Sequence, residues 1–174
     1  MSRQDLPARS QVSIRRFEAA DWPPLWALLQ ATFASGDTYA YAPDCREADI
    51  HKAWVEPPAA AFVACEPNGR IVGTYTIKPN QPGLGAHVCN CGYVVAPDAQ
   101  GGGIATALCE HSQREAVARG FRAMQFNLVV STNVRAVRLW QRLGFTVVGT
   151  LPKAFHHMKL GYVDALVMYK ELVT

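Results

Sequence analysis

Apolar residues along the chain either alternate with polar ones or gather in short runs, and both patterns predict β-strands. Residues 12–17 (V-S-I-R-R-F) alternate, as a strand with one buried face does. Short apolar runs bounded by Gly, Pro, Asn or Asp predict the remaining strands. These runs lie at residues 60–65, 71–78, about 86–96, 124–130, 145–151 and 163–170.

Apolar residues at helical spacing predict four helices among these strands. The first begins at Asp21, with Pro23 and Pro24 in its first turn and a buried face that includes Leu25, Leu29 and Phe33. The others are expected at residues 47–54, 103–119 and 134–143, and residues 35–44 read as a loop. Antiparallel strands followed by βα units predict a mixed α/β sheet. Residues 1–10 are expected to form a flexible arm before a single domain of residues 11–174.

Composition and charge exclude several classes of protein. Nearly half of the 174 residues are apolar (49%), which suits one domain with a sizeable core. A net charge of +3 is too mild to predict a nucleic-acid partner. No apolar run reaches the roughly 18 residues of a membrane helix, and no secretory leader is evident. Five cysteines without metal-ligand spacing predict free thiols and no metal, so a cytoplasmic protein is expected.

A glycine-rich turn between a predicted strand and a predicted helix is the first candidate for chemistry. Residues 94–105 read V-V-A-P-D-A-Q-G-G-G-I-A. Glycines let the backbone approach a ligand, and a helix start offers free N–H groups to an anion such as a pyrophosphate. A P-loop is excluded because no Gly-Lys-Ser/Thr follows, and the G-x-G-x-x-G dinucleotide spacing is absent. Taken alone, the segment fits a ligand site and a simple turn equally well.

A second segment, residues 133–145, settles that choice. Asn133 caps the predicted helix and Gly144 ends it, giving N-V-R-A-V-R-L-W-Q-R-L-G-F. With this segment the chain resembles the GNAT superfamily of N-acetyltransferases. Gln100-x-x-Gly103-x-Ala105 matches the superfamily's pyrophosphate motif, and Asn133 through Phe145 matches its second cofactor helix. The resemblance extends from about residue 12 to the C-terminus, so residues 11–174 are expected to be a GNAT domain.

The resemblance implies how the fold binds its co-substrate, acetyl-CoA. It implies a single-domain α/β fold whose mixed sheet splays into a V between the fourth and fifth strands. Acetyl-CoA would lie in the V, with its pantetheine arm on the backbone of Val94 and Val95, where an N–H group would hold the developing oxyanion. The other expected cofactor-binding residues are Gln100, Gly101, Gly102, Gly103, Ile104, Ala105, Asn133 and Trp140.

The acceptor side is predicted from polar residues in otherwise apolar strands. Asn90 and Asn127 are the candidate catalytic residues, because a buried amide needs hydrogen-bond partners and a ligand can supply them. Their surroundings resemble the fungal acetyltransferases of proline-like imino acids such as azetidine-2-carboxylate. That resemblance places Tyr93 beside the substrate, and Tyr39 is expected in the loop that borders the acceptor pocket. Residues 154–157 are the other expected wall of that pocket, and Arg46, Lys78, His156 and His157 are alternative candidates to hold a substrate carboxylate.

One departure from the superfamily concerns the proton donor. Trp140 stands where related enzymes usually hold the Tyr that protonates the departing thiolate, and an indole cannot act as that acid. The predicted strand at residues 86–96 also lacks a carboxylate that could act as a base. The sequence therefore predicts direct attack of a small-molecule amine, in the resemblance an amino or imino acid, on acetyl-CoA. A protein or peptide N-acetyltransferase and a catalytically silent acyl-CoA sensor remain alternatives, and the sequence leaves a homodimer open.

Overall fold

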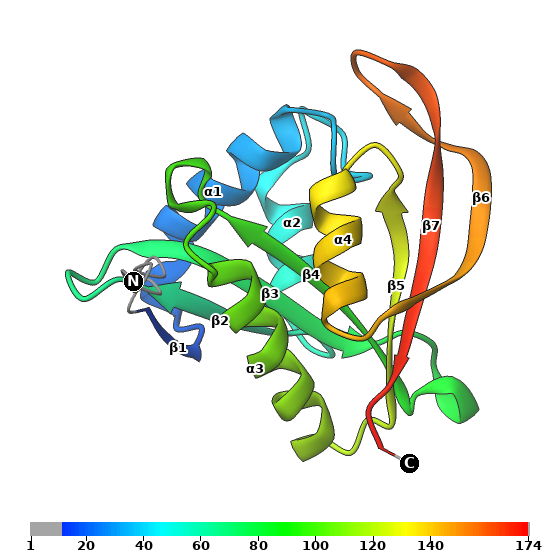
Figure 1. Ribbon diagram of the computed structural model, residues 1–174. Coiled ribbons are helices and arrows are strands. Elements are labelled where there is room, and N and C mark those ends of the chain that lie inside the picture. Colours follow the sequence, from blue (N-terminus) through cyan, green and yellow to red (C-terminus); the bar gives the residue numbers. More distant parts are fainter. Residues whose placement is uncertain (1–11, 174) are drawn as a thin grey trace, which may run out of the picture.

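The chain folds around one mixed β-sheet with α-helices on both faces (Figure 1). The computed structural model describes residues 12–173, so the arm expected at residues 1–10 lies outside the described residues. Within that range the sheet has seven strands in the order β1-β2-β3-β4-β5-β7-β6. Their bounds are β1 Ser13–Arg16, β2 Ala60–Cys65, β3 Ile71–Pro79, β4 Val88–Val95, β5 Ala123–Val130, β6 Thr146–His157 and β7 Gly161–Glu171.

Two apolar cores form because alternate strand residues point to opposite faces of the sheet. In β2, Phe62 and Ala64 join the core under one pair of helices, while Ala61 and Val63 join the core under the other pair. The first core lies beneath α3 (Ile104–Ala118) and α4 (Val134–Arg142), and the second beneath α1 (Trp22–Ala34) and α2 (Glu47–Trp54). Burial on both faces explains the continuous apolar run of β2. No helix among residues 12–173 is long and apolar enough to cross a membrane.

The strand β7 enters the sheet between β5 and β6 and runs antiparallel to both. The strand predicted at residues 145–151 is longer in the structure, where it is β6 and continues to His157. With β7 it makes a long hairpin (Figure 1). The pairing of β6 with β7 is irregular between Leu151 and Phe155, which is where the apolar pattern of the sequence breaks. At the hairpin tip the Met158 N–H donates to the Gly36 carbonyl oxygen at 3.1 Å. The tip therefore contacts the segment after α1, which is residues 35–46.

The predicted V-shaped splay lies between β4 and β5. The two strands pair in parallel only at Val88–Ala123, Cys89–Met124 and Asn90–Gln125. Beyond Asn90 they diverge, while β4 stays paired with β3 up to Val95. This divergence of β4 and β5 past Asn90 forms a fork in the sheet. On the far side of the fork, β5 has an irregularity in its pairing with β7 between Phe126 and Val129. The fold class predicted from the sequence is confirmed, including the position of the splay.

Candidate active site

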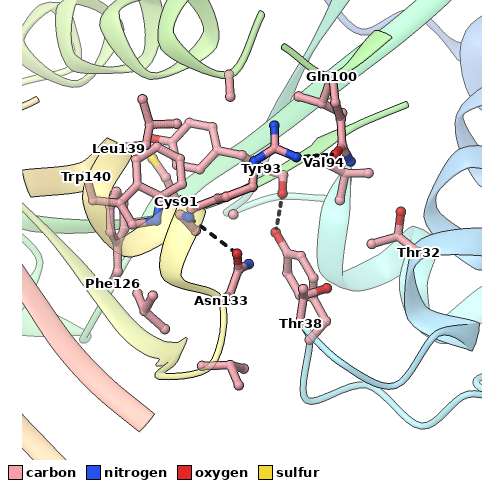
Figure 2. Close-up of a pocket in the computed structure, with 18 of the residues that line it drawn as sticks. Thr32, Thr38, Cys91, Tyr93, Val94, Gln100, Phe126, Asn133, Leu139 and Trp140 are labelled. Atoms are coloured by element: carbon pink, nitrogen blue, oxygen red, sulfur yellow. Dashed lines mark hydrogen bonds between the residues drawn. The ribbon is translucent and has the colours of Figure 1, made fainter. Parts of the chain in front are cut away.

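The fork between β4 and β5 opens into a cavity of about 970 Å³. Its walls come from the segment after α1, from β3, β4 and β5, from the glycine-rich turn with the start of α3, and from α4. Figure 2 shows Tyr93, Phe126, Leu139 and Trp140 together on one side of this cavity, and Thr32 and Thr38 on the other. The predicted site residues, Gly102 apart, line it: Tyr39, Asn90, Tyr93, Val94, Val95, Gln100, Gly101, Gly103, Ile104, Ala105, Asn127, Asn133 and Trp140.

The glycine-rich turn presents bare backbone to the cavity. Gly101 and Gly103 have φ angles of +88° and +81°, a region that residues with a side chain rarely adopt. A Cβ atom added at either position would meet no heavy atom within 4 Å, so the missing side chains leave open space. Gly103 is the N-cap of α3 and supplies no capping side chain. The N–H groups of the first turn therefore lack an intrahelical acceptor and can bind an anion. This backbone cradle fits a pyrophosphate.

The start of α4 faces the cradle from the opposite wall. Asn133 caps α4, and its Oδ1 accepts from the Ala136 N–H at 3.3 Å. Arg135 reaches across the cavity, with its Nη1 3.5 Å from Gln100 Oε1 (Figure 2, where Gln100 and Asn133 are labelled). The guanidinium adds a positive charge beside a cradle already suited to an anion. Sequence analysis missed Arg135; its place in the first turn after the Asn133 cap is the signal that could have found it.

The wall beneath α4 is aromatic. The Trp140 ring lies 5.0 Å from that of Tyr93 and 5.1 Å from that of Phe126, measured between centroids, and Trp140 is only 8% exposed. The Tyr93 hydroxyl is 2.7 Å from Ser112 Oγ of α3, so it is hydrogen-bonded within the protein. Burial raises the pKa of Tyr93 well above its ordinary value. Tyr93 therefore offers the cavity its ring, and its hydroxyl stays protonated at physiological pH.

Tyr39 joins the segment after α1 to the open part of β4. Its hydroxyl donates to the Tyr93 carbonyl oxygen at 2.8 Å, a bond visible in Figure 2 beside the labelled Tyr93. Burial raises the pKa of Tyr39 as well, so it too remains protonated. A side chain at Gly92 would crowd this contact, because a Cβ there would lie 3.0 Å from the Tyr39 hydroxyl and 3.4 Å from Trp54. Tyr39 thus holds the segment after α1 against the fork.

The two candidate catalytic asparagines lie in one hydrogen-bonded group at the vertex of the fork. Asn90 Nδ2 donates to the Gln125 carbonyl oxygen at 2.9 Å and so ties β4 to β5 where the strands part. Asn127 Oδ1 accepts from Gln125 Nε2 at 2.9 Å, and its Nδ2 donates to Asn80 Oδ1 at 2.7 Å. Asn127 is exposed, whereas Asn90 is partly buried. Each amide therefore has a hydrogen-bond partner within the protein, and both amides still line the cavity.

Charged residues separate clearly into those at the cavity and those away from it. Lys78 of β3 and Asp37 of the segment after α1 both line the cavity. Arg46 does not, and its Nε forms an ion pair with Asp49 at 2.8 Å. Residues 154–157, an expected second wall of the acceptor pocket, belong to β6 and are not among the lining residues. Apart from two arginines of α4, the charged side chains at the cavity therefore come from β3 and the segment after α1.

The cavity thus has an anion cradle at the start of α3 and polar side chains of β3, β4 and β5 along its walls, in a fold opened where two parallel strands part. Residues 22–145 match the acetyltransferase (GNAT) family. The chain therefore belongs to the GNAT family, and the family resemblance predicted from the sequence is confirmed.

Three relatives show how far the similarity extends. The N-acetyltransferase aca1 of Schizosaccharomyces pombe is 38% identical over 112 residues, which are 63% of this chain and 53% of that protein, so the chain spans about half of its length. A GCN5-related N-acetyltransferase from Kribbella flavida has a similar structure, with a TM-score of 0.87 and 41% identity over 92% of this chain and 97% of that one. A phosphinothricin acetyltransferase from Sinorhizobium meliloti, solved in complex with AcCoA, has a TM-score of 0.82 over 93% of this chain and 89% of that one. Its 20% identity shows a shared fold.

Proposed function

We propose that the protein transfers the acetyl group of acetyl-CoA to the amine of a small molecule. The observation that carries this proposal is the fork itself. It leaves the side of β4 that faces β5 unpaired beside the cavity, and β4 leads into the cradle at the start of α3. The names of the relatives support the same co-substrate. The direct N-acetyltransferase mechanism of the family suits the residues that line the cavity.

Acetyl-CoA fits the cavity in one direction. Gln100 and the turn through Ala105 hold the pyrophosphate with the free N–H groups of the first turn of α3, and Arg135 adds its charge from α4. The pantetheine arm runs along Val94 and Val95 as an added strand, where β5 no longer supplies hydrogen bonds to β4. Trp140 packs against the arm near the sulfur. Asn133 keeps the start of α4 in place through its cap.

The reaction then proceeds by direct attack. The neutral amine of the acceptor attacks the thioester carbonyl, the carbon–nitrogen bond forms, and the carbon–sulfur bond breaks. The amine nitrogen gives its proton to solvent water, and the departing thiolate takes up a proton from water to leave as CoA thiol. A backbone N–H of Val94 or Val95 stabilises the oxyanion, and Asn90 and Asn127 orient the reactants. Cys91 lines the cavity, but burial raises the pKa of its thiol well above the ordinary value, so it is no ready nucleophile. This favours transfer without an acetyl-cysteine intermediate.

A thiol-release assay with acetyl-CoA and three groups of acceptors tests the proposal. Amino acids, simple amines and short peptides are each supplied, and release of free CoA is followed together with the mass of the acetylated product. Turnover with small amines supports the proposal. Turnover with peptides alone would instead favour a peptide N-acetyltransferase, and binding of acetyl-CoA without turnover on any acceptor would favour a sensor.

A further inference from the structure

Apart from the arginines of α4, the described cavity wall carries one side chain of each charge. Lys78 approaches from β3 and Asp37 from the segment after α1. Among the lining residues that the structure describes, Asp37 is the single acid, and the cations other than Lys78 are Arg135 and Arg142 of α4. A positive and a negative group thus face the place where the acceptor must sit.

The strand register places Lys78 at the vertex of the fork. Lys78 pairs with Asn90, and Asn90 pairs with Gln125, the last pair before β4 and β5 diverge. Thr76 lies two residues before Lys78 and therefore points to the same face of the sheet. Its hydroxyl donates to the Trp54 carbonyl oxygen of α2 at 2.7 Å, which identifies this face as the one beneath α1 and α2. Lys78 consequently points toward the side that Asp37 also borders.

Neither charge is neutralised by an ion pair with another side chain of residues 12–173. The ion pairs in this part of the chain use Arg15, Arg46, Arg70, Arg119 and His51 as cations, and their partners do not include Asp37. Asp37 accepts one hydrogen bond, from Ser35 Oγ at 2.5 Å. Lys78 and Asp37 are both partly buried, so a ligand group of opposite charge would interact with each more strongly than at an open surface.

We propose that Lys78 and Asp37 determine the charge specificity of the acceptor site. Lys78 binds the carboxylate of an amino or imino acid, and Asp37 attracts the amino group of the same molecule. This inference rests on the proposed acetyl transfer to small amines, and it assigns the selection of the acceptor to two named side chains. An amine without a carboxylate would enter the same site but would leave Lys78 without a partner.

Paired acceptors that differ only in the carboxylate test the assignment. Proline and pyrrolidine make one pair, azetidine-2-carboxylate and azetidine a second, phenylalanine and phenethylamine a third, and the most active pair is used. The variant Lys78→Met should lower kcat/KM for the acid about tenfold to a hundredfold, as loss of a hydrogen bond to a charged group does. It should leave kcat/KM for the amine unchanged within about twofold. Lys78→Arg should restore most of the loss, since it keeps the charge.

Two further variants separate the roles of the charges. Asp37→Asn should lower kcat/KM for the acid and the amine by the same factor, because both acceptors carry the same amino group. Lys52→Met removes an exposed lysine of α2 that does not line the cavity and should change neither.

Equal loss on both acceptors in Lys78→Met, or no loss on either, would overturn the assignment while acetyl transfer by the wild type stands. A wild type that acetylates peptides and neither member of any pair would overturn the proposed function and this inference together.

Discussion

Gly103 gives the sharpest test of the cofactor cradle. A side chain at this position would have open space around its Cβ and would extend into the cavity beside the first turn of α3. Gly103→Asp would therefore place a carboxylate where the pyrophosphate is expected. Two unit charges 4 Å apart repel by about 4 kcal/mol at an effective dielectric constant of 20. Even a third of this, about 1.4 kcal/mol, lowers affinity tenfold.

The cost to folding should be small. A residue with a side chain at φ +81° costs roughly 1–2 kcal/mol, although Asp and Asn tolerate this region better than most. A carboxylate at a helix N-terminus returns about 0.3–1 kcal/mol. The net loss should lower the Tm by only a few degrees, since about 1 kcal/mol shifts the Tm of a domain of this size by 2–4 °C.

Isothermal titration with acetyl-CoA measures the effect, and two controls isolate it. Gly103→Asn has nearly the same shape without the charge and should bind much more tightly than Gly103→Asp. Gly69→Asp introduces the same carboxylate at φ +85° in the turn between β2 and β3, outside the cavity, and should not alter binding. The difference between Asp and Asn at position 103 should shrink as salt is added. Equal affinities for the two folded variants would refute the assignment of the cradle.

Three other predictions follow from the site. Asn90→Ala should lower turnover, and it should lower the free energy of unfolding by about 1 kcal/mol because its bond to β5 is lost. Asn127→Ala, at an exposed position, should lower kcat and leave the Tm unchanged. Unaltered turnover per folded molecule in both variants would make the two amides purely structural. Arg135→Ala should raise the KM for acetyl-CoA several-fold and leave the KM of the acceptor alone, and a change confined to the acceptor would contradict its place at the cradle. Because burial raises the pKa of both Tyr39 and Tyr93 above the ordinary value near 10, neither should lose its proton below that pH. The rate should therefore rise with pH as the acceptor amine becomes neutral, without a falling limb from a tyrosine acid. The rising limb should move between two acceptors of different amine pKa, and limbs that stay fixed for both acceptors would point to an enzyme acid and base instead.

Local patterns in the sequence were enough to predict which residues of the glycine-rich turn and of α4 lie together at the cavity. The turn at residues 94–105 and the helix that begins after Asn133 are contiguous segments, and each carries its own caps and glycines. The splay between β4 and β5 also follows, once these two segments are recognised as parts of one fold. The structure places nearly all of their residues around one cavity.

The acceptor end could not be predicted in the same way, because it depends on contacts between distant segments. Asp37 belongs to a loop whose path is set by the bond from Tyr39 to β4, more than fifty residues away in the chain. Lys78 was one of several cations with no feature to separate them, until the register placed it opposite Asn90. Residues 154–157 were expected in a loop beyond the strand at 145–151, whereas they continue β6 past an irregularity in its pairing with β7.

The fork also gives the sheet two additional edges in the middle of the molecule. Past Asn90, the side of β4 that faces β5 has lost its strand partner, and only the bond from Tyr39 to the Tyr93 carbonyl oxygen replaces part of that pairing. Backbone amides there should exchange with deuterium quickly in the free protein, as amides of an open edge do. A bound pantetheine arm that completes the pairing should slow this exchange at residues 91–95 without any rearrangement of the fold. The interior edge left by the fork is thus a place where the proposed co-substrate would stabilise the sheet.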